Sequence, residues 1–122
     1  TNKPFCFNRK EAKTHGEAGI FVGSAPKGRA LIVDDVISSG KSIIESIDLL
    51  SVNGAIPSSI VVAFDRMELG IDKRASIEIS EKYKIQVYSI ITLDDIIDFL
   101  KNNKMMSTEL KLMTEYMELY KR

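Results

Sequence analysis

Short hydrophobic runs and amphipathic segments alternate along the chain, which is typical of a parallel β-sheet covered by helices. Leu31, Ile32 and Val33 form a continuous apolar run of the kind that is buried on both faces of such a sheet. We therefore expect an α/β fold with a central, mostly parallel sheet flanked by helices. The apolar runs predict strands over residues 4–7, 20–24, 30–33, 59–64 and 85–91.

Helical periodicity is found between and after these strands. Ile43, Ile44, Ile47 and Leu50 recur at helical spacing, and Asn53-Gly54 then supplies a left-handed stop. Thr92 is placed to act as the N-cap of a later helix. The last helix has a Met-rich apolar stripe, which indicates packing against a core or an interface. The predicted helices cover residues 41–52, 72–83, 93–101 and 107–120.

Composition and charge narrow the class of protein. The chain has 122 residues with 44% hydrophobic content, enough to bury one core. Seventeen basic and seventeen acidic residues give no net charge that would attract nucleic acid or an anionic membrane, so neither partner is expected. No apolar run approaches the roughly 20 residues of a membrane span. A single cysteine cannot form an internal disulfide, which fits a reducing cytoplasm.

The segment ALIVDDVISSGKS, residues 30–42, carries the most specific chemistry. Asp34 and Asp35 interrupt the apolar run at the place where a parallel sheet opens its ligand crevice. A small, hydroxyl-rich turn follows and leads into a helix, whose first N–H groups favour an anion such as a phosphate. Two carboxylates beside an anion-binding turn are suited to holding a sugar phosphate. On their own, however, they would also fit helix capping or a solvated sheet edge.

Three segments in order resemble the orotate phosphoribosyltransferases, a family of type I phosphoribosyltransferases. Residues 30–42 resemble the motif that binds phosphoribosyl diphosphate (PRPP), residues 7–19 (FNRKEAKTHGEAG) the catalytic loop, and residues 64–70 (FDRMELG) the base-contacting segment. The resemblance implies the type I phosphoribosyltransferase (Rossmann-like) fold. Family members run to roughly two hundred residues, and this chain opens without Met. We accordingly interpret residues 1–122 as the C-terminal part of a single domain whose amino-terminal part is missing. We expect the fragment alone to be inactive.

The PRPP motif assigns a role to each of its polar groups. Asp34 and Asp35 are expected to be catalytic and to accept hydrogen bonds from the two ribose hydroxyls. Mg²⁺ is the expected cofactor, bound through pyrophosphate oxygens and water, so that no protein ligand is named. Backbone N–H groups and hydroxyls of the turn are expected to bind the 5′-phosphate, with Lys41 either adding charge or facing solvent. The turn consists of Val36, Ile37, Ser38, Ser39, Gly40, Lys41 and Ser42.

The basic loop at about residues 8–19 is expected to bind the pyrophosphate leaving group through Arg9, Lys10, Lys13 and His15. Lys13 and His15 belong to the family's K-x-H-G-x-G pattern and are also the catalytic candidates. Ala18 replaces a residue that is often glycine in the family. His15 titrates near neutrality, which leaves a proton donor and a plain cation as alternatives. The family implies that this loop reaches the neighbouring subunit's active site, and hence a homodimer. A merely solvated, flexible hairpin is the alternative.

Arg66 follows a predicted strand and is expected to face the carboxylate of orotate, because a guanidinium can bond two oxygens at once. Ser38 is expected to contact the base as well. The alternative for Arg66 is an ion pair with Asp65 or Glu68.

The function implied by these motifs is the transfer of ribose 5-phosphate from PRPP to orotate in cytoplasmic pyrimidine (UMP) biosynthesis. The products are orotidine 5′-monophosphate and pyrophosphate. A phosphoribosyltransferase acting on a purine would keep the PRPP motif but would not need Arg66 or the basic loop. A regulatory PRPP sensor without turnover would not need the loop cations. A phosphoacceptor signalling domain also uses paired acids, but without the Ser/Gly turn.

Overall fold

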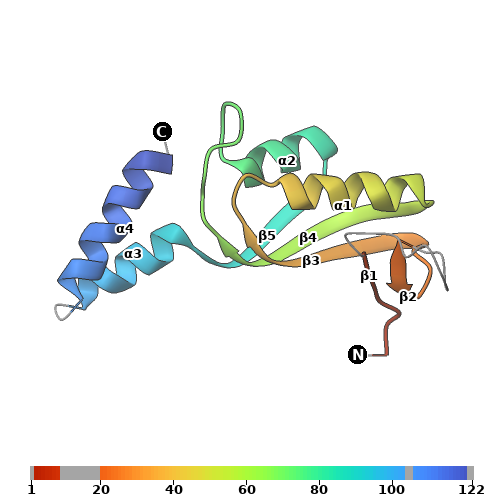
Figure 1. Ribbon diagram of the computed structural model, residues 1–122, viewed down its shortest axis with the longest axis horizontal. Coiled ribbons are helices and arrows are strands. Elements are labelled where there is room, and N and C mark those ends of the chain that lie inside the picture. Colours follow the sequence, from red (N-terminus) through yellow and green to blue (C-terminus); the bar gives the residue numbers. More distant parts are fainter. Residues whose placement is uncertain (1, 9–19, 104–105, 121–122) are drawn as a thin grey trace.

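The computed structural model describes residues 2–8, 20–103 and 106–120. Two short strands come first, a β-α-β-α-β unit that contains the PRPP-like motif comes next, and two further helices follow (Figure 1). The strands are β1 (Cys6–Asn8), β2 (Phe21–Gly23), β3 (Gly28–Ile37), β4 (Ala55–Asp65) and β5 (Gln86–Thr92). The helices are α1 (Lys41–Val52), α2 (Ala75–Tyr83), α3 (Leu93–Asn102) and α4 (Ser107–Tyr120).

The central sheet is parallel and has the order β3-β4-β5, which confirms the predicted fold class. Helices α1 and α2 lie together on one face of it (Figure 1). The main core lies between these two helices and the sheet, where Ile32, Ile60 and Val87 form one row across the three strands. Ile43 and Ile47 of α1 are buried against this face. The helical periodicity of the sequence therefore identified the core face of α1 correctly.

Strands β3 and β4 are longer than predicted. We expected a strand end before Asp34, but β3 continues through both acids to Ile37. Side chains leave a strand toward the two faces of the sheet, and here Asp34 is half-buried while Asp35 is exposed, so both acids fit in the strand without being enclosed. Strand β4 begins at Ala55 and includes Pro57, where a register shift opposite Ala30 and Leu31 accommodates the missing N–H.

Strands β1 and β2 pair with each other as a separate antiparallel ribbon and are not part of the parallel sheet. Asn8 pairs with Phe21, so the ladder brings together the two residues on either side of the basic loop. Phe21 also packs against the main core. The ribbon thus places the base of the basic loop next to the sheet.

Helix α3 begins at a complete capping box. The Thr92 hydroxyl accepts a hydrogen bond from the Asp95 N–H, and the Asp95 carboxylate accepts one from the Thr92 N–H at 2.7 Å. The Thr92 hydroxyl also donates to the Asp95 carboxylate at 2.6 Å, and this bond is the largest cause of the lowered pKa of Asp95, followed by the bond from the Thr92 N–H. The predicted start of this helix is confirmed.

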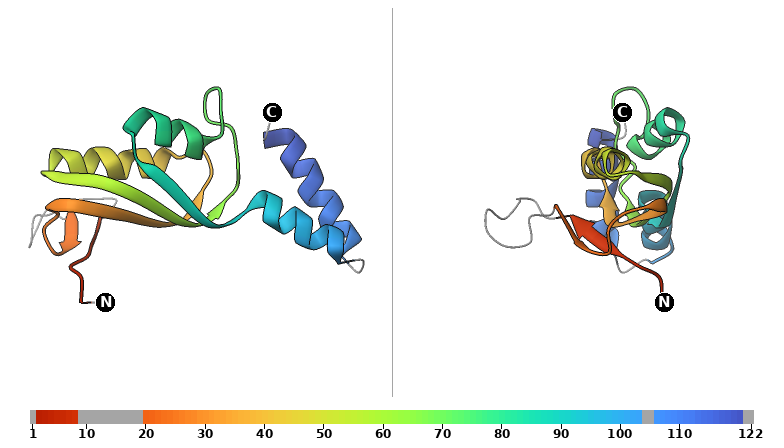
Figure 2. Two further views of the ribbon diagram at one scale, coloured as in Figure 1. Left: turned by 180° about the vertical axis from the view of Figure 1, so that it is seen from behind. Right: turned by 90° about the vertical axis from the view of Figure 1, so that its right-hand side faces the viewer.

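Helices α3 and α4 form a second, smaller core beside the end of β4. Met67, Leu93 and Ile97 are buried there, with Met113 and Met117 of α4 packed against them. The apolar stripe of α4 therefore lies in core packing, as predicted. Both helices extend beyond the end of the sheet, and α4 turns back beside the segment that joins β4 to α2 (Figures 1 and 2). Among the described residues, no helix is long and apolar enough to span a membrane.

The face of the sheet opposite α1 and α2 is open among the described residues (Figure 2). Val33, Val61 and Tyr88 form a row across this face, and Val33 is 72% exposed. Leu31 and Ile90 lie on the same face and are also exposed. Parallel sheets are normally covered on both faces, so this apolar surface would contact water in the isolated chain.

We expect the isolated 122-residue chain to self-associate through this face. Val33→Lys combined with Ile90→Lys should shift the chain toward monomer, because two charges would interrupt the apolar surface. Sedimentation at several protein concentrations measures the effect. A matched control is Val52→Lys with Ile71→Lys, which changes two exposed apolar residues away from the sheet and should leave the association unchanged. Equal association of all three chains would contradict this assignment of the surface.

Candidate active site

The predicted PRPP and base segments meet at the carboxyl ends of β3 and β4. Ile37 and Asp65 are paired in the ladder, and the Arg66 N–H donates to the Ile37 carbonyl at 3.0 Å. The segment after β3 leads into α1, whereas the segment after β4 leads toward α2 (Figure 1). Parallel α/β sheets bind ligands at this edge, so the two motifs are placed as one site requires.

Asp34 and Asp35 lie close to that edge. The Asp34 carboxylate accepts a hydrogen bond from the Ser42 hydroxyl at 3.3 Å, which places it beside the start of α1. Asp35 is exposed, and its carboxylate accepts the Val36 N–H at 2.7 Å. Because side chains alternate along a strand, the two carboxylates leave β3 in opposite directions. The two carboxylates therefore do not point side by side at one spot, and a ligand that contacts both must lie across the end of β3.

The turn before α1 depends on Gly40. This residue is buried in the left-handed region with φ 75°, and a Cβ added there would lie 2.5 Å from Ile79 Cδ1 of α2. The start of α1 is therefore packed directly against α2. No side chain caps α1, so the first N–H groups of the helix remain available to an anion.

The other residues of the turn differ in what they can offer a phosphate. Ser38 is half-buried, while Ser39 and Ser42 are exposed and can present hydroxyls. The Ile37 side chain is buried, so this residue can contribute only backbone groups. Lys41 faces solvent, with its ammonium 4.0 Å from Glu45, which favours the second of the two alternatives for this lysine.

Arg66 makes the ion pair that the sequence left as an alternative. Its Nη2 atom lies 2.9 Å from Glu68 Oε1, and the same nitrogen donates to the Tyr116 hydroxyl of α4. The Tyr116 hydroxyl in turn donates to Glu68. The Arg66 side chain remains 38% exposed, against 15% for Glu68. Arg66 is thus held from one side while part of its guanidinium still faces solvent.

The Tyr116 hydroxyl has an environment that keeps it protonated. Burial raises the pKa of Tyr116, and the hydrogen bond to Glu68 raises this pKa further. Arg66 opposes the shift but does not reverse it. Tyr116 can therefore act as a permanent donor to Glu68. The sequence offered Glu68 as an alternative partner of Arg66 but gave no indication of Tyr116, although a tyrosine beside an apolar stripe is a signal for a buried hydroxyl contact.

Asp65 supports the turn that carries Arg66. It is the buried charged residue among the residues described, and its carboxylate accepts hydrogen bonds from the Met67 N–H and the Ser76 hydroxyl, both at 2.7 Å. Met67 has a positive φ of 57°, which is unusual for a residue with a side chain. Asp65 thus holds the strained residue immediately after Arg66.

Glu78 organises the rest of the same segment. Its carboxylate accepts the N–H groups of Ile71, Asp72 and Lys73 at 2.6–2.9 Å. These three bonds lower the pKa of Glu78, with the Ile71 N–H as the largest cause. Helix α2 begins at Ala75 and not at the predicted Asp72, because Leu69 and Arg74 form an antiparallel bridge and the Gly70 N–H donates to the Lys73 carbonyl, which keeps the backbone before Ala75 out of the helix.

The lowered pKa of Glu78 predicts a pH-dependent contribution to stability. The folded-state pKa lies below the ordinary value of 4.5, so the stabilisation is complete above that pH and is lost as the pH falls through the folded-state pKa. We therefore expect the stability difference between the natural polypeptide and its Glu78→Gln variant to be largest above about pH 5 and to shrink toward pH 3. Urea unfolding of both proteins across this range measures it. Parallel curves would contradict the prediction.

Arg9, Lys10, Lys13 and His15 lie outside the described residues. Their predicted binding to pyrophosphate therefore stays a prediction. The ribbon of β1 and β2 brackets them between Asn8 and Phe21.

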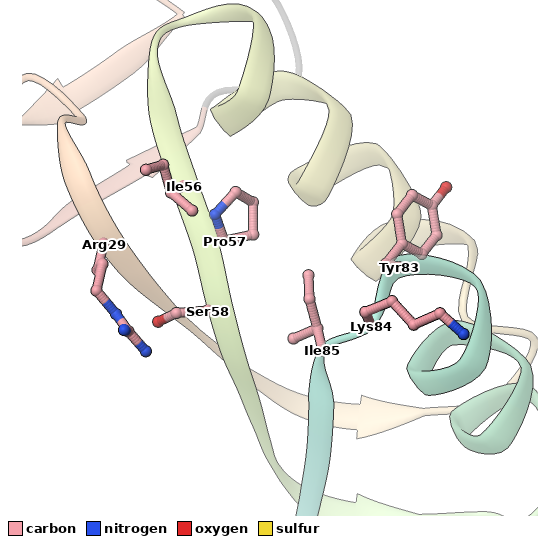
Figure 3. A pocket seen from close by; sticks show the side chains of 7 residues that line it. All are labelled: Arg29, Ile56, Pro57, Ser58, Tyr83, Lys84 and Ile85. Carbon is pink, nitrogen blue, oxygen red and sulfur yellow. The ribbon is translucent and has the colours of Figure 1, made fainter.

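A hollow of about 340 Å³ lies at the other end of the sheet, away from the candidate active site. Figure 3 shows Arg29, Pro57 and Ile85 around it, near the beginnings of β3, β4 and β5. Parallel sheets place their ligand sites at the opposite, carboxyl end of the strands. This hollow is therefore separate from the candidate active site.

No protein-family model matches this chain, but curated proteins match it over nearly its whole length. Orotate phosphoribosyltransferase of Thiobacillus denitrificans is 50% identical over 120 residues, which cover 98% of this chain and 57% of that protein. Orotate phosphoribosyltransferase of Hahella chejuensis is 47% identical over 118 residues, or 96% of this chain and 55% of that protein. The chain spans a little over half the length of these curated relatives.

Solved structures agree with the curated relatives. The crystal structure of orotate phosphoribosyltransferase from Francisella tularensis matches the entire chain and 58% of its own, with a TM-score of 0.74 and 27% identity. The structure of Leishmania donovani UMP synthase matches 98% of this chain and 25% of its own, with a TM-score of 0.74 and 26% identity. In sequence and in fold, the chain belongs to the orotate phosphoribosyltransferase family.

Proposed function

We propose that the natural polypeptide containing this chain is an orotate phosphoribosyltransferase. In this reaction the bond between C1 of the PRPP ribose and pyrophosphate breaks, and a bond forms from C1 to N1 of orotate, which loses its proton. The products are orotidine 5′-monophosphate and pyrophosphate. The observation that carries the proposal is the hydrogen bond from the Arg66 N–H to the Ile37 carbonyl, which joins the base segment to the PRPP segment at one sheet edge.

The PRPP half of the site has groups for both the sugar and its phosphate. Asp34 and Asp35 would accept hydrogen bonds from the ribose hydroxyls, and their charge would stabilise the positive charge that develops on the ribose. The N–H groups at the start of α1, with the hydroxyls of Ser39 and Ser42, would bind the 5′-phosphate. Fixing the ribose at both ends would hold C1 in line with the incoming base.

The base half would be formed by the segment after β4. The exposed part of the Arg66 guanidinium would bond the orotate carboxylate, and Ser38 would contact the base from the neighbouring turn. The basic loop at residues 8–19 would bind pyrophosphate through Arg9, Lys10, Lys13 and His15 and neutralise its charge as it leaves.

Mg²⁺ would fit this site in a limited way. The described residues contain no group of three or more His, Cys, Asp or Glu side chains that could hold a metal ion. Asp34 and Asp35 still offer carboxylate oxygens beside the PRPP position, and Mg²⁺ commonly keeps few protein ligands when it binds substrate phosphates. The ion would neutralise pyrophosphate, while Asp34 and Asp35 would orient the ribose and any water that the ion carries.

The assembly and location of the protein are also proposed from the family. A homodimer would allow the loop at residues 8–19 to enter the neighbouring active site. PRPP carries several phosphate charges and does not cross a lipid bilayer unaided, which supports action in the cytoplasm. Because the relatives are nearly twice as long, we expect the 122 residues alone to be inactive.

The test is the loss of orotate absorbance after PRPP and Mg²⁺ are added to the natural polypeptide. Turnover that requires both additions is the expected result. A mixture without PRPP controls for orotate binding alone, and adenine and guanine test the alternative substrates. Turnover of a purine with no loss of orotate would overturn the proposal, and PRPP binding without turnover of any base would favour a regulatory sensor.

A further inference from the structure

Arg66 is oriented by a hydrogen-bonded triangle with Glu68 and Tyr116. Its Nη2 contacts Glu68 Oε1 at 2.9 Å and donates to the Tyr116 hydroxyl, which itself donates to the same Glu68 oxygen. The guanidinium carbon also lies 5.2 Å from the centre of the Tyr116 ring. Each corner of the triangle therefore contacts the other two.

Helix α4 is anchored to the Arg66 segment by contacts outside this triangle. The Leu69 N–H donates to the Tyr120 carbonyl at 3.0 Å, and the centres of the Tyr116 and Tyr120 rings are 4.6 Å apart. Met113 and Met117 pack against the buried Met67. Because α4 is fixed at several points, the Tyr116 hydroxyl has a defined position and can impose one on Arg66.

The triangle leaves part of the guanidinium for a ligand. Among the described residues, the hydrogen bonds and ion pair of the Arg66 side chain all involve Nη2. Arginine has a planar fork of five N–H donors, so a carboxylate can still approach another edge of it. A guanidinium held at one nitrogen loses less freedom when it binds that carboxylate, which favours affinity.

We infer that Tyr116, acting with Glu68, is a positioning residue that orients Arg66 toward the carboxylate of the base. The inference rests on the proposed function and deepens it, since it makes α4 a determinant of base recognition. No segment of α4 needs to touch the substrate for this role. Removing the Tyr116 hydroxyl should therefore change the KM for orotate and not the KM for PRPP.

The test compares Tyr116→Phe with the unchanged natural polypeptide. Phe keeps the ring contacts of Tyr116 but removes the hydroxyl, which accepts a hydrogen bond from Arg66 and donates one to Glu68. We expect kcat/KM for orotate to fall about fivefold through KM, as for the loss of one ordinary hydrogen bond, since Arg66 keeps its ion pair with Glu68, while kcat and the KM for PRPP change less than twofold. Tyr120→Phe is the matched control, since it removes a hydroxyl from the stacked ring on the same helix.

A double-mutant cycle separates positioning from a structural role. In an Arg66→Ala background, Tyr116→Phe should have no further effect on orotate affinity, because there is no guanidinium to orient. Calorimetric binding of orotidine 5′-monophosphate measures this even where turnover is slow. An unchanged orotate KM in Tyr116→Phe, or an equal loss with and without Arg66, would overturn the inference. If the unchanged protein does not use orotate, the proposed function itself has failed, which is a different result.

Discussion

Asp34→Asn and Asp35→Asn, each made alone in the natural polypeptide, are expected to lower kcat/KM for PRPP about 100-fold, in the range for losing one preorganised electrostatic contact to a transition state. Asn has nearly the shape of Asp but no charge, so it cannot stabilise the positive charge that builds on the ribose. The Ser42 hydroxyl would still find an oxygen at position 34. Steady-state kinetics with varied PRPP measures the effect.

The control for this prediction is Asp48→Asn, which removes an exposed carboxylate from α1 away from the sheet edge. It should leave kcat/KM within about twofold of the unchanged protein, as expected for a surface charge. Thermal unfolding of all three variants should be similar, because none of these carboxylates is buried. Full activity in both Asp34→Asn and Asp35→Asn would mean that the two acids only face solvent at a strand end.

Asp65→Ala is expected to lower the free energy of unfolding by about 2–3 kcal/mol, the cost of leaving buried polar groups without partners. The Met67 N–H and the Ser76 hydroxyl both donate to this carboxylate in a buried setting. Without it, Met67 would also lose the contact that holds its positive φ. Urea unfolding of the natural polypeptide measures the loss.

Ser76→Ala provides the matched comparison for Asp65→Ala. It removes one donor to the Asp65 carboxylate and leaves the Met67 bond in place, so its cost should be about 1 kcal/mol. We also expect Asp65→Ala to raise the KM for orotate, because the turn that carries Arg66 would be less ordered. Equal stability of Asp65→Ala and the unchanged protein would show that the turn is held by other contacts.

Local patterns in the sequence were sufficient for most of the fold. The helical spacing of Ile43, Ile47 and Leu50 identified the core face of α1, and Thr92 was recognised as the cap of α3. Both depend on residues within a few positions of each other, so the sequence contains the complete signal. The strand ends were less predictable because β3 continues through two charged residues, with Asp34 half-buried and Asp35 exposed, and how far a side chain is covered depends on the packing around the whole sheet.

The start of α2 shows the same limit at shorter range. Residues 72–83 had helical periodicity, but the helix begins only at Ala75, because Leu69 and Arg74 form an antiparallel bridge and the Gly70 N–H donates to the Lys73 carbonyl. Periodicity describes side-chain faces and contains no information on backbone bonds of this kind.

By itself, the sequence determined which chemical groups are candidates for the proposed PRPP and base sites, because the PRPP motif, the basic loop and the Arg66 segment are each contiguous. The tertiary structure alone decided that Tyr116 contacts Arg66. Tyr116 lies 50 positions away in the chain and reaches Arg66 only because α3 and α4 fold back on the end of β4. Contacts of this kind depend on the packing of whole elements, which no local pattern encodes.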